Sequence, residues 1–152
     1  MPSIEGGGVE KNLFLVSNYL IKKVNNISLI TISKDYKKKF DKKINFITLS
    51  SKIWDKFGRR FKYFLAIILL IKEIFKNRNL IVFSFQANIY CIMICKFFGI
   101  KVISRSNSAP YGWSKNRIKR FIFKIFLRAA DKIVVNSEEF KKDLKKEFNV
   151  DS

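Results

Sequence analysis

Near its amino end the chain reads Pro2-Ser3-Ile4-Glu5-Gly6-Gly7-Gly8-Val9-Glu10-Lys11, with three consecutive glycines. Apolar residues then recur at helical spacing, which predicts a helix from Gly8 to Lys22. Glycine lets a backbone approach a ligand closely, and the first helical turn presents unpaired N–H groups and a partial positive charge. We therefore expect Gly6, Gly7 and Gly8 to form a loop suited to a phosphate or a sugar oxygen, although an ordinary strand-to-helix turn has the same composition. Such a loop normally follows a strand, so the chain is expected to begin just after its own first strand.

Strands and helices alternate along the rest of the chain. The expected strands are Ile27–Ile32, Ile44–Leu49, Leu80–Phe85, Lys101–Ser104 and Lys132–Val135. The expected helices are Phe57–Lys76, Ala87–Phe98, Lys115–Ala130 and Glu138–Phe148, with Gly99 ending the second of them. Alternation of this kind predicts an α/β fold with a doubly wound, mostly parallel sheet whose first strand is largely missing. With 152 residues, 48% of them hydrophobic, the chain is most simply one domain.

Polar and small residues gather where the expected strands end. Four segments hold them: Glu5–Gly8, Ser84–Asn88, Arg105–Tyr111 and Asn136–Ser137. In open parallel sheets ligands bind beyond the carboxyl ends of the strands, so these segments predict the cleft.

Individual residues of these segments each allow two interpretations. The Arg105 guanidinium suits a phosphate or carboxylate, and Asn107 lies beside it, but both also fit an ordinary surface loop. Asn136 and Ser137 are candidate ligands that also favour capping of the last helix. Glu5 is a weaker candidate for binding a hydroxyl group of a ligand. Asp131 is interpreted as a structural turn residue.

The composition limits the possible chemistry. The formal charge of +19, from 31 Lys and Arg against 12 Asp and Glu, indicates anionic partners, although an AT-rich genome would produce part of this excess. The absence of histidine argues against most hydrolase triads and most zinc sites. Cys91 and Cys95 lie one helical turn apart without further ligands, which predicts reduced core thiols, no metal and a cytoplasmic protein. The longest apolar run, Tyr63–Ile71, is far shorter than the roughly 20 residues of a membrane span.

The expected helix Lys115–Ala130 carries two sets of apolar residues. We expect one stripe to face the sheet, made of Ile118, Phe121, Ile122, Ile125 and Phe126. The opposite side would then present Phe123 and Leu127 among the cations Lys119, Arg120 and Lys124. Apolar side chains ringed by cations suit an anionic membrane surface, helped here by the helix Phe57–Lys76. Packing against another domain or a neighbouring loop is the alternative.

Three motifs resemble one known family. The opening stretch Pro2–Lys11 resembles the Gly-Gly loop that follows the first strand of glycosyltransferase family 4 enzymes. The segment Ala130-Asp131-Lys132-Ile133-Val134-Val135-Asn136-Ser137 resembles a stretch late in the same amino-terminal domain. Between them, Ile103-Ser104-Arg105-Ser106-Asn107-Ser108-Ala109-Pro110 stands where the family carries a polar loop on the acceptor side. Many relatives have a histidine in that loop, and Arg105 or Asn107 stands near its place.

The resemblance implies the amino-terminal half of a GT-B fold, in which two Rossmann-like domains face each other across a cleft. In this family the amino-terminal domain binds chiefly the acceptor and the carboxyl-terminal domain binds a nucleotide sugar. The family transfers sugars with retention of configuration and typically without a metal. The implied acceptor is a glycan or a lipid-linked glycan of bacterial envelope polysaccharide or lipopolysaccharide. The donor domain is absent from these residues, so they are expected to be inactive alone.

Two other interpretations remain at the level of sequence. A basic α/β module could bind nucleic acid through its lysines, although the aromatic residues lie in helical stripes and no nucleic-acid motif is present. The chain could also be a truncated frame without a function of its own.

Overall fold

The computed structural model describes residues 1–2, 4, 7–32, 36–49, 54, 58–86, 88–107 and 117–148, apart from the side chains of Lys119, Glu147 and Phe148. The chain divides into two compact units, Met1–Glu73 and Ile74–Ser152. Within the described residues every strand pairing is parallel, and the strands form two small sheets. The expected α/β class with a parallel arrangement is therefore confirmed.

The first unit holds a two-stranded sheet. Its elements are α1 (Gly8–Leu20), β1 (Ser28–Ile30), the short 3-10 helix η1 (Lys37–Lys39), β2 (Asn45–Ile47) and most of α2 (Arg59–Lys76). The register pairs Ser28 with Asn45 and Ile30 with Ile47. The Met1 amino group donates to the Ile30 carbonyl at 2.8 Å, and the Ile32 N–H donates to the Pro2 carbonyl at 3.0 Å. The first two residues therefore lie beside β1 with strand-like hydrogen bonds.

The core of this unit lies between its strands and α2. Ile32, Leu65 and Leu69 are buried together, and half-buried Ile30, Ile47, Leu49 and Trp54 pack around them. In the part of the chain that the structure describes, no helix is long and apolar enough to cross a membrane.

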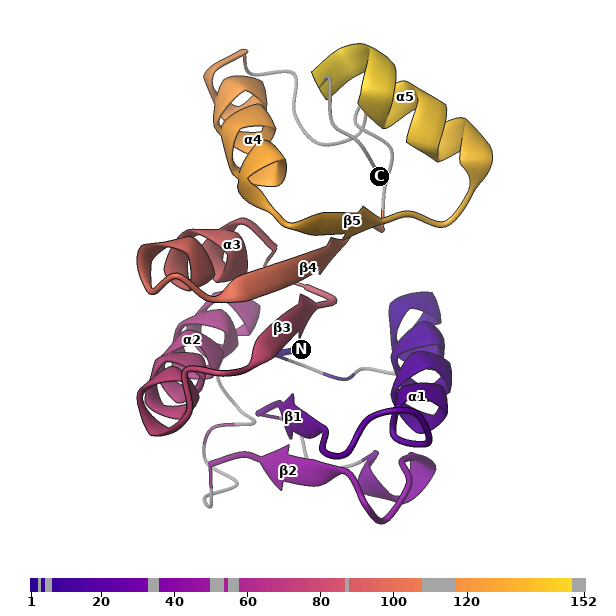
Figure 1. The fold of residues 1–152 in the computed structure, drawn as a ribbon, viewed down its shortest axis with the longest axis vertical. Coiled ribbons are helices and arrows are strands. Elements are labelled where there is room, and N and C mark those ends of the chain that lie inside the picture. The colour runs from indigo at the N-terminus through magenta and orange to yellow at the C-terminus, as the bar shows by residue number, and fades with distance from the viewer. Residues whose placement is uncertain are drawn as a thin grey trace. The chain divides into compact units, whose positions relative to one another are not determined.

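The second unit is a three-stranded sheet with helices between its strands (Figure 1). Its elements are β3 (Ile81–Ser84), α3 (Asn88–Phe97), β4 (Lys101–Arg105), α4 (Arg117–Ala129), β5 (Lys132–Val134) and α5 (Glu138–Phe148). The strand order is β3-β4-β5, and α3 packs on β3, β4 and α4. Residues from β4, α3, α4 and α5 are completely or almost completely buried: Val102, Ile92, Leu127 and Leu144.

Gly99 ends α3, as the sequence predicts. It adopts a φ of 70°, which glycine reaches without the steric cost that a Cβ would add. The Ile100 N–H donates to the Cys95 carbonyl at 2.7 Å, which closes the end of the helix. The next residue, Lys101, can then begin β4 directly.

The two cysteines of α3 are free thiols, Cys95 buried and Cys91 half-buried. Burial raises the pKa of Cys95 to about 12, and the neighbouring Cys91 contributes to the same shift. Burial also raises the pKa of Cys91. Both thiols are therefore protonated and poorly nucleophilic near neutral pH, as core residues are.

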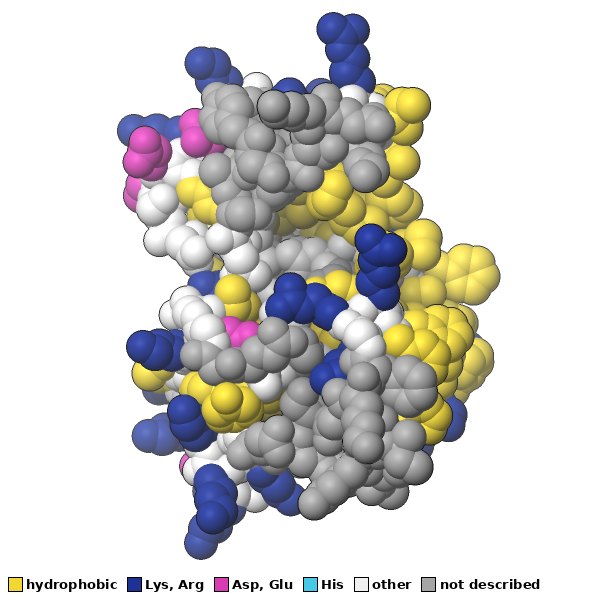
Figure 2. Space-filling view, turned by 180° about the vertical axis from the view of Figure 1, so that it is seen from behind, with side chains coloured by type: hydrophobic (Ala, Val, Ile, Leu, Met, Phe, Trp, Pro, Cys, Tyr) yellow, Lys and Arg dark blue, Asp and Glu magenta, His cyan; other side chains and the backbone are white. Residues whose placement is uncertain are grey.

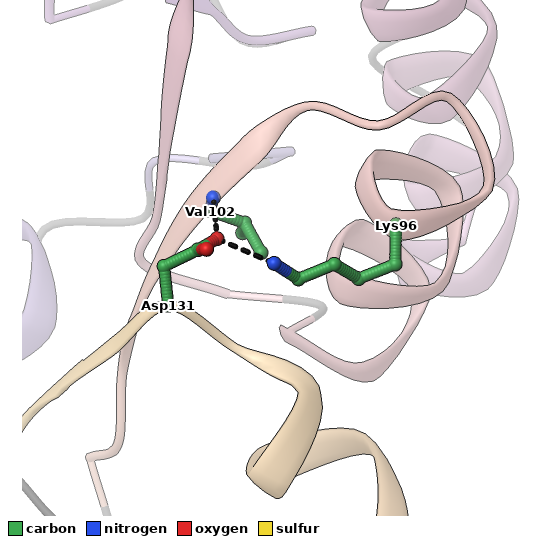
Figure 3. A network of polar contacts seen from close by, with 3 residues as sticks. All are labelled: Lys96, Val102 and Asp131. Atoms are coloured by element: carbon green, nitrogen blue, oxygen red, sulfur yellow. Dashed lines mark hydrogen bonds and ion pairs between the residues drawn. The ribbon is translucent and has the colours of Figure 1, made fainter.

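Asp131 ties the amino-terminal edge of the sheet together (Figure 3). Its Oδ2 accepts a hydrogen bond from the Lys96 Nζ at 2.6 Å and another from the Val102 N–H at 2.7 Å. The Asp131 N–H donates back to the Val102 carbonyl at 3.0 Å. The hydrogen bond from Lys96 and then that from Val102 lower the pKa of Asp131. The expected structural role of this residue is therefore confirmed.

Replacing Asp131 with Asn should lower the free energy of unfolding by about 1 kcal/mol at pH 7, because the ion pair is partly exposed and screened by solvent. A lowered carboxyl pKa adds stability that is present above the unfolded pKa of about 4 and is lost as the pH falls through the folded value. Urea unfolding at pH 7 and pH 3 should therefore show a smaller loss of stability on acidification in Asp131→Asn than in the natural protein. Asp143→Asn serves as the control, and equal losses in Asp131→Asn and the natural protein would contradict this role.

The expected orientation of α4 is wrong. Leu127 is only 2% exposed and Phe123 is half-buried, so these two residues do not form an outer face. The stripe that was expected to face the sheet is instead exposed, with Ile118 at 70% and Phe121 at 63%, joined by Ile122 and Ile125, while Phe126 is half-buried. The physical reason is that α4 packs on α3 in the folded chain, and the side of α4 that becomes buried carries Leu127 rather than the wider stripe.

This correction changes the candidate membrane surface. Leu127 and Phe123 are not part of an exposed surface, because one is buried and the other half-buried. Of the three predicted cations, Arg120 is exposed and Lys124 is half-buried, and the Lys119 side chain is not among those described. Figure 2 shows hydrophobic side chains gathered where α3 and α4 lie, in the upper right of the view. The exposed residues of this region are Tyr90, Met93 and Phe97 on α3 and Ile118, Phe121, Ile122 and Ile125 on α4, hereafter the α3–α4 apolar surface.

Candidate functional site

The carboxyl ends of β3, β4 and β5 meet at one edge of the second unit's sheet. The register pairs Ser84 with Ser104, and Arg105 with Val134, so the three strands end at nearly the same level. The chain then continues through Phe85 and Gln86 after β3, Ser106 and Asn107 after β4, and Asn136 after β5. This edge is where parallel sheets bind ligands.

Side-chain hydrogen bonds join the ends of β3 and β4. The Ser84 hydroxyl lies 2.9 Å from Asn88 Oδ1, and Asn88 Nδ2 donates to the Arg105 carbonyl at 2.6 Å. Asn107 Nδ2 donates to the Phe85 carbonyl at 2.8 Å. This last bond fixes the orientation of the Asn107 amide, so its Oδ1 is available as an acceptor.

Arg105 is the central side chain of the edge. It is only 5% exposed, and its Nη2 donates to Asn136 Oδ1 at 2.7 Å. The guanidinium carbon lies 5.4 Å from the centre of the Phe85 ring, in a cation–π contact. Burial lowers the pKa of Arg105, and within the described chain no carboxylate pairs with it. A guanidinium remains charged despite such a shift, so this edge holds a buried positive charge that has no acidic partner among the described residues.

Several polar atoms at this edge lack a hydrogen-bond partner. Among the described residues, the buried side-chain atoms without a partner are Gln86 Oε1, Ser104 Oγ, Arg105 Nη1 and Asn107 Oδ1. Buried polar groups are normally satisfied, and leaving one unpaired costs about 1–3 kcal/mol. All four atoms belong to the ends of β3 and β4, so the unpaired polar groups of the described residues are concentrated at this edge.

The structure brings together three of the predicted site residues, Arg105, Asn107 and Asn136. Ser137 lies next to Asn136, but its Oγ accepts a hydrogen bond from the Phe140 N–H at 3.2 Å and so caps α5. Capping is the role that the sequence favours for Ser137, and it engages the hydroxyl.

Sequence reasoning located the segment Ser84–Asn88 but did not single out its residues. Gln86 could have been identified from its position after a buried strand. Nothing in the sequence distinguishes Ser104, which lies inside a strand.

The glycine loop belongs to the first unit. Gly6 and Glu5 lie outside the described residues, while Gly7 and Gly8 stand at the start of α1. Gly7 has an ordinary φ of −82°, but a Cβ there would lie 2.9 Å from Glu10 Oε2. The absence of a side chain therefore leaves room for buried Glu10 in the first turn, where a carboxylate favours the helix dipole. Ligand contact by Gly6, Gly7, Gly8 and Glu5 stays a prediction.

The family model for Glycosyltransferase Family 4 matches residues 6–152. The chain belongs to glycosyltransferase family 4. A crystal structure of a UGT transferase from Siraitia grosvenorii in complex with UDP is similar in fold, with a TM-score of 0.55 and 10% sequence identity. The match covers 97% of this chain and 46% of that chain, so these residues span less than half of the length of the similar chain. No curated protein matches the sequence.

Membership of the family agrees with the expected fold. The parallel β3–β5 sheet with its intervening helices has the architecture expected of half a GT-B fold. The edge that carries Arg105 lies where the sequence predicts the acceptor-side loop of this family.

Proposed function

We propose that this chain forms the acceptor-side domain of a retaining glycosyltransferase. It would act with a nucleotide-sugar donor and a glycan or lipid-linked acceptor in the synthesis of envelope polysaccharide. The observation that carries the proposal is the group of buried, unpartnered polar atoms at the carboxyl edge of β3 and β4. Family membership supports sugar transfer, and the UDP in the similar structure supports a nucleotide-sugar donor.

The arrangement suggests how the domain contributes to transfer. Hydrogen bonds between the strand ends hold Arg105 and Asn107 in place before a ligand arrives. A preorganised group of this kind can fix an acceptor without reordering its own side chains, which favours a near-attack geometry. In this proposal the side chains at the edge position the acceptor.

Transfer can be tested with the protein that carries this chain. The protein is incubated with radiolabelled UDP-, GDP- and dTDP-sugars and a lipid extract from its source, and label in the lipid or glycan fraction is counted. We expect transfer from one class of donor, and the anomeric proton coupling of the product should match that of the donor. Release of free sugar without transfer, or an inverted product, would contradict the proposal.

We propose further that the α3–α4 apolar surface rests on an anionic lipid bilayer at the cytoplasmic face of the membrane. Residues 117–129 of α4 carry cations and no acidic residue: Arg117, Lys119, Arg120, Lys124 and Arg128. Large apolar side chains of the same surface are exposed to water, with Phe97 at 81%, and an exposed apolar patch of this kind is typical of a surface that binds another molecule or a membrane. Apolar side chains combined with cations match the interface of a bilayer that contains anionic lipid.

Vesicle flotation tests this surface. The natural protein should float with phosphatidylglycerol vesicles more than with phosphatidylcholine vesicles, and high salt should reduce the difference. The double variant Phe121→Ser with Ile125→Ser should bind about tenfold less, since it removes two large apolar contacts. Leu15→Ser, which changes an exposed apolar residue of α1, is the matched control. Equal binding to both vesicle types, or a dimer in solution that the double variant dissolves, would contradict the membrane assignment.

A further inference from the structure

The buried guanidinium of Arg105 has no negatively charged partner among the described residues. A buried cation is costly unless an anion is close to it, and hydrogen bonding to a neutral amide does not neutralise it. Its described contacts are the neutral Asn136 amide and the Phe85 ring. Nη1 remains unpaired although the residue is 95% removed from solvent. The missing partner of Arg105 is therefore a negative charge.

The other unpartnered atoms at this edge indicate that the ligand also carries hydrogen-bond donors. Asn107 Oδ1 is an acceptor without a partner, and the hydrogen bond from Nδ2 to the Phe85 carbonyl fixes the orientation of the amide. Gln86 Oε1 is also an unpaired acceptor, and Ser104 Oγ can accept or donate. A free phosphate would satisfy Arg105, but near neutral pH it carries only one or two hydroxyl donors for these oxygens. Hydroxyl groups supply the donors that they lack.

We propose that this edge binds an anionic sugar, with Arg105 holding its phosphate or carboxylate group and with Asn107 and Gln86 accepting hydrogen bonds from its hydroxyls. The inference deepens the proposed function, on which it rests, by giving the acceptor a charge. A neutral sugar would satisfy the amide oxygens and leave the guanidinium uncompensated. Inorganic phosphate would compensate the guanidinium but would offer the amide oxygens fewer hydroxyl donors than a sugar does.

Binding to defined probes tests the inference. Glucose 1-phosphate, glucuronate, glucose and inorganic phosphate are each titrated into the protein that carries this chain, by calorimetry and by thermal shift. Glucose 1-phosphate or glucuronate should bind at least tenfold more tightly than glucose or inorganic phosphate, and the tighter ligand should raise the Tm. The two charged sugars separate a phosphate from a carboxylate as the source of the anion.

Variants assign the binding to Arg105. Arg105→Gln should bind charged sugars no better than glucose, while Arg105→Lys should retain part of the preference because it keeps the charge. Asn107→Ala should weaken both charged and neutral sugars by a similar factor. Lys101→Gln changes an exposed cation at the opposite end of β4 and should leave all affinities unchanged. Circular dichroism confirms that each variant is folded, and Arg105→Lys provides the test if Arg105→Gln is not.

Three results of the binding experiments would overturn the inference. They are equal affinity for glucose and the charged sugars, an unchanged preference in Arg105→Gln, or competition by UDP for the same Arg105-dependent site, which would assign the anion to the donor. Transfer to an uncharged acceptor would overturn it and leave the proposed function intact. Arg105-dependent binding of charged sugars without any sugar transfer would instead overturn the proposed function alone.

Discussion

Replacing Arg105 with Gln should lower kcat/KM for sugar transfer by about 10- to 100-fold. Hydrogen bonds to charged groups contribute roughly 1.5–3 kcal/mol, which corresponds to that range. Arg105 is buried against Phe85 and linked to Asn136, so it reaches its position before the acceptor binds. The measurement is the initial rate of label transfer at several acceptor concentrations. The loss should be larger at low acceptor concentration, because in the proposed function this side chain contacts the acceptor.

Lys101→Gln is the matched control for this effect. It removes a positive charge from the same strand at the other edge of the sheet and should retain the natural rate. An equal loss in both variants would indicate a general effect of charge. A natural rate in Arg105→Gln would remove this side chain from the site.

Replacing Leu127 with Ala should lower the free energy of unfolding by about 2–5 kcal/mol. The side chain is 2% exposed, and it lies on α4, which packs on α3. Truncation would therefore leave a cavity that the surrounding helices only partly fill. A loss of this size is a large share of the roughly 5–15 kcal/mol that stabilises a typical domain. Urea unfolding followed by circular dichroism measures it.

Phe121→Ala on the same helix is the comparison. Phe121 is 63% exposed, so its truncation should change stability by no more than about 0.5 kcal/mol while weakening vesicle binding. A destabilising Phe121→Ala together with a neutral Leu127→Ala would mean that the wider apolar stripe faces the core after all.

The contrast between Leu127 and Phe121 shows where sequence reasoning reached its limit. Periodicity correctly predicts that α4 is a helix with apolar stripes, but two sets of apolar residues share its thirteen positions. Judged from the helix alone, the larger set, which includes Phe121, is expected to face the protein interior. In the folded chain α4 packs on α3, and the side of α4 that carries Leu127 is the buried one. The orientation of α4 depends on its packing against other elements, which cannot be predicted from the sequence of α4 alone.

The positions of the helices and strands could be predicted from the sequence better than the surroundings of individual side chains. Gly99 is a clear example, because the end of a helix depends on local backbone preference. Asp131 is another example, because a carboxylate between a helix and a strand usually accepts hydrogen bonds from nearby N–H groups, as it does here from Val102. The proximity of the candidate site residues was also predicted from sequence, because Arg105 and Asn136 come directly after expected strands, and the structure brings their side chains together. The burial of Arg105 and its unpaired Nη1 could not be predicted, since they depend on the neighbouring strand ends.

The most direct measurement of the central claim is a crystal structure of the protein soaked with glucose 1-phosphate. We predict a phosphate oxygen within about 3 Å of Arg105 Nη1 and a sugar hydroxyl at hydrogen-bond distance from Asn107 Oδ1. Ligand bound elsewhere, with Arg105 Nη1 paired to a carboxylate of the protein itself, would contradict the account.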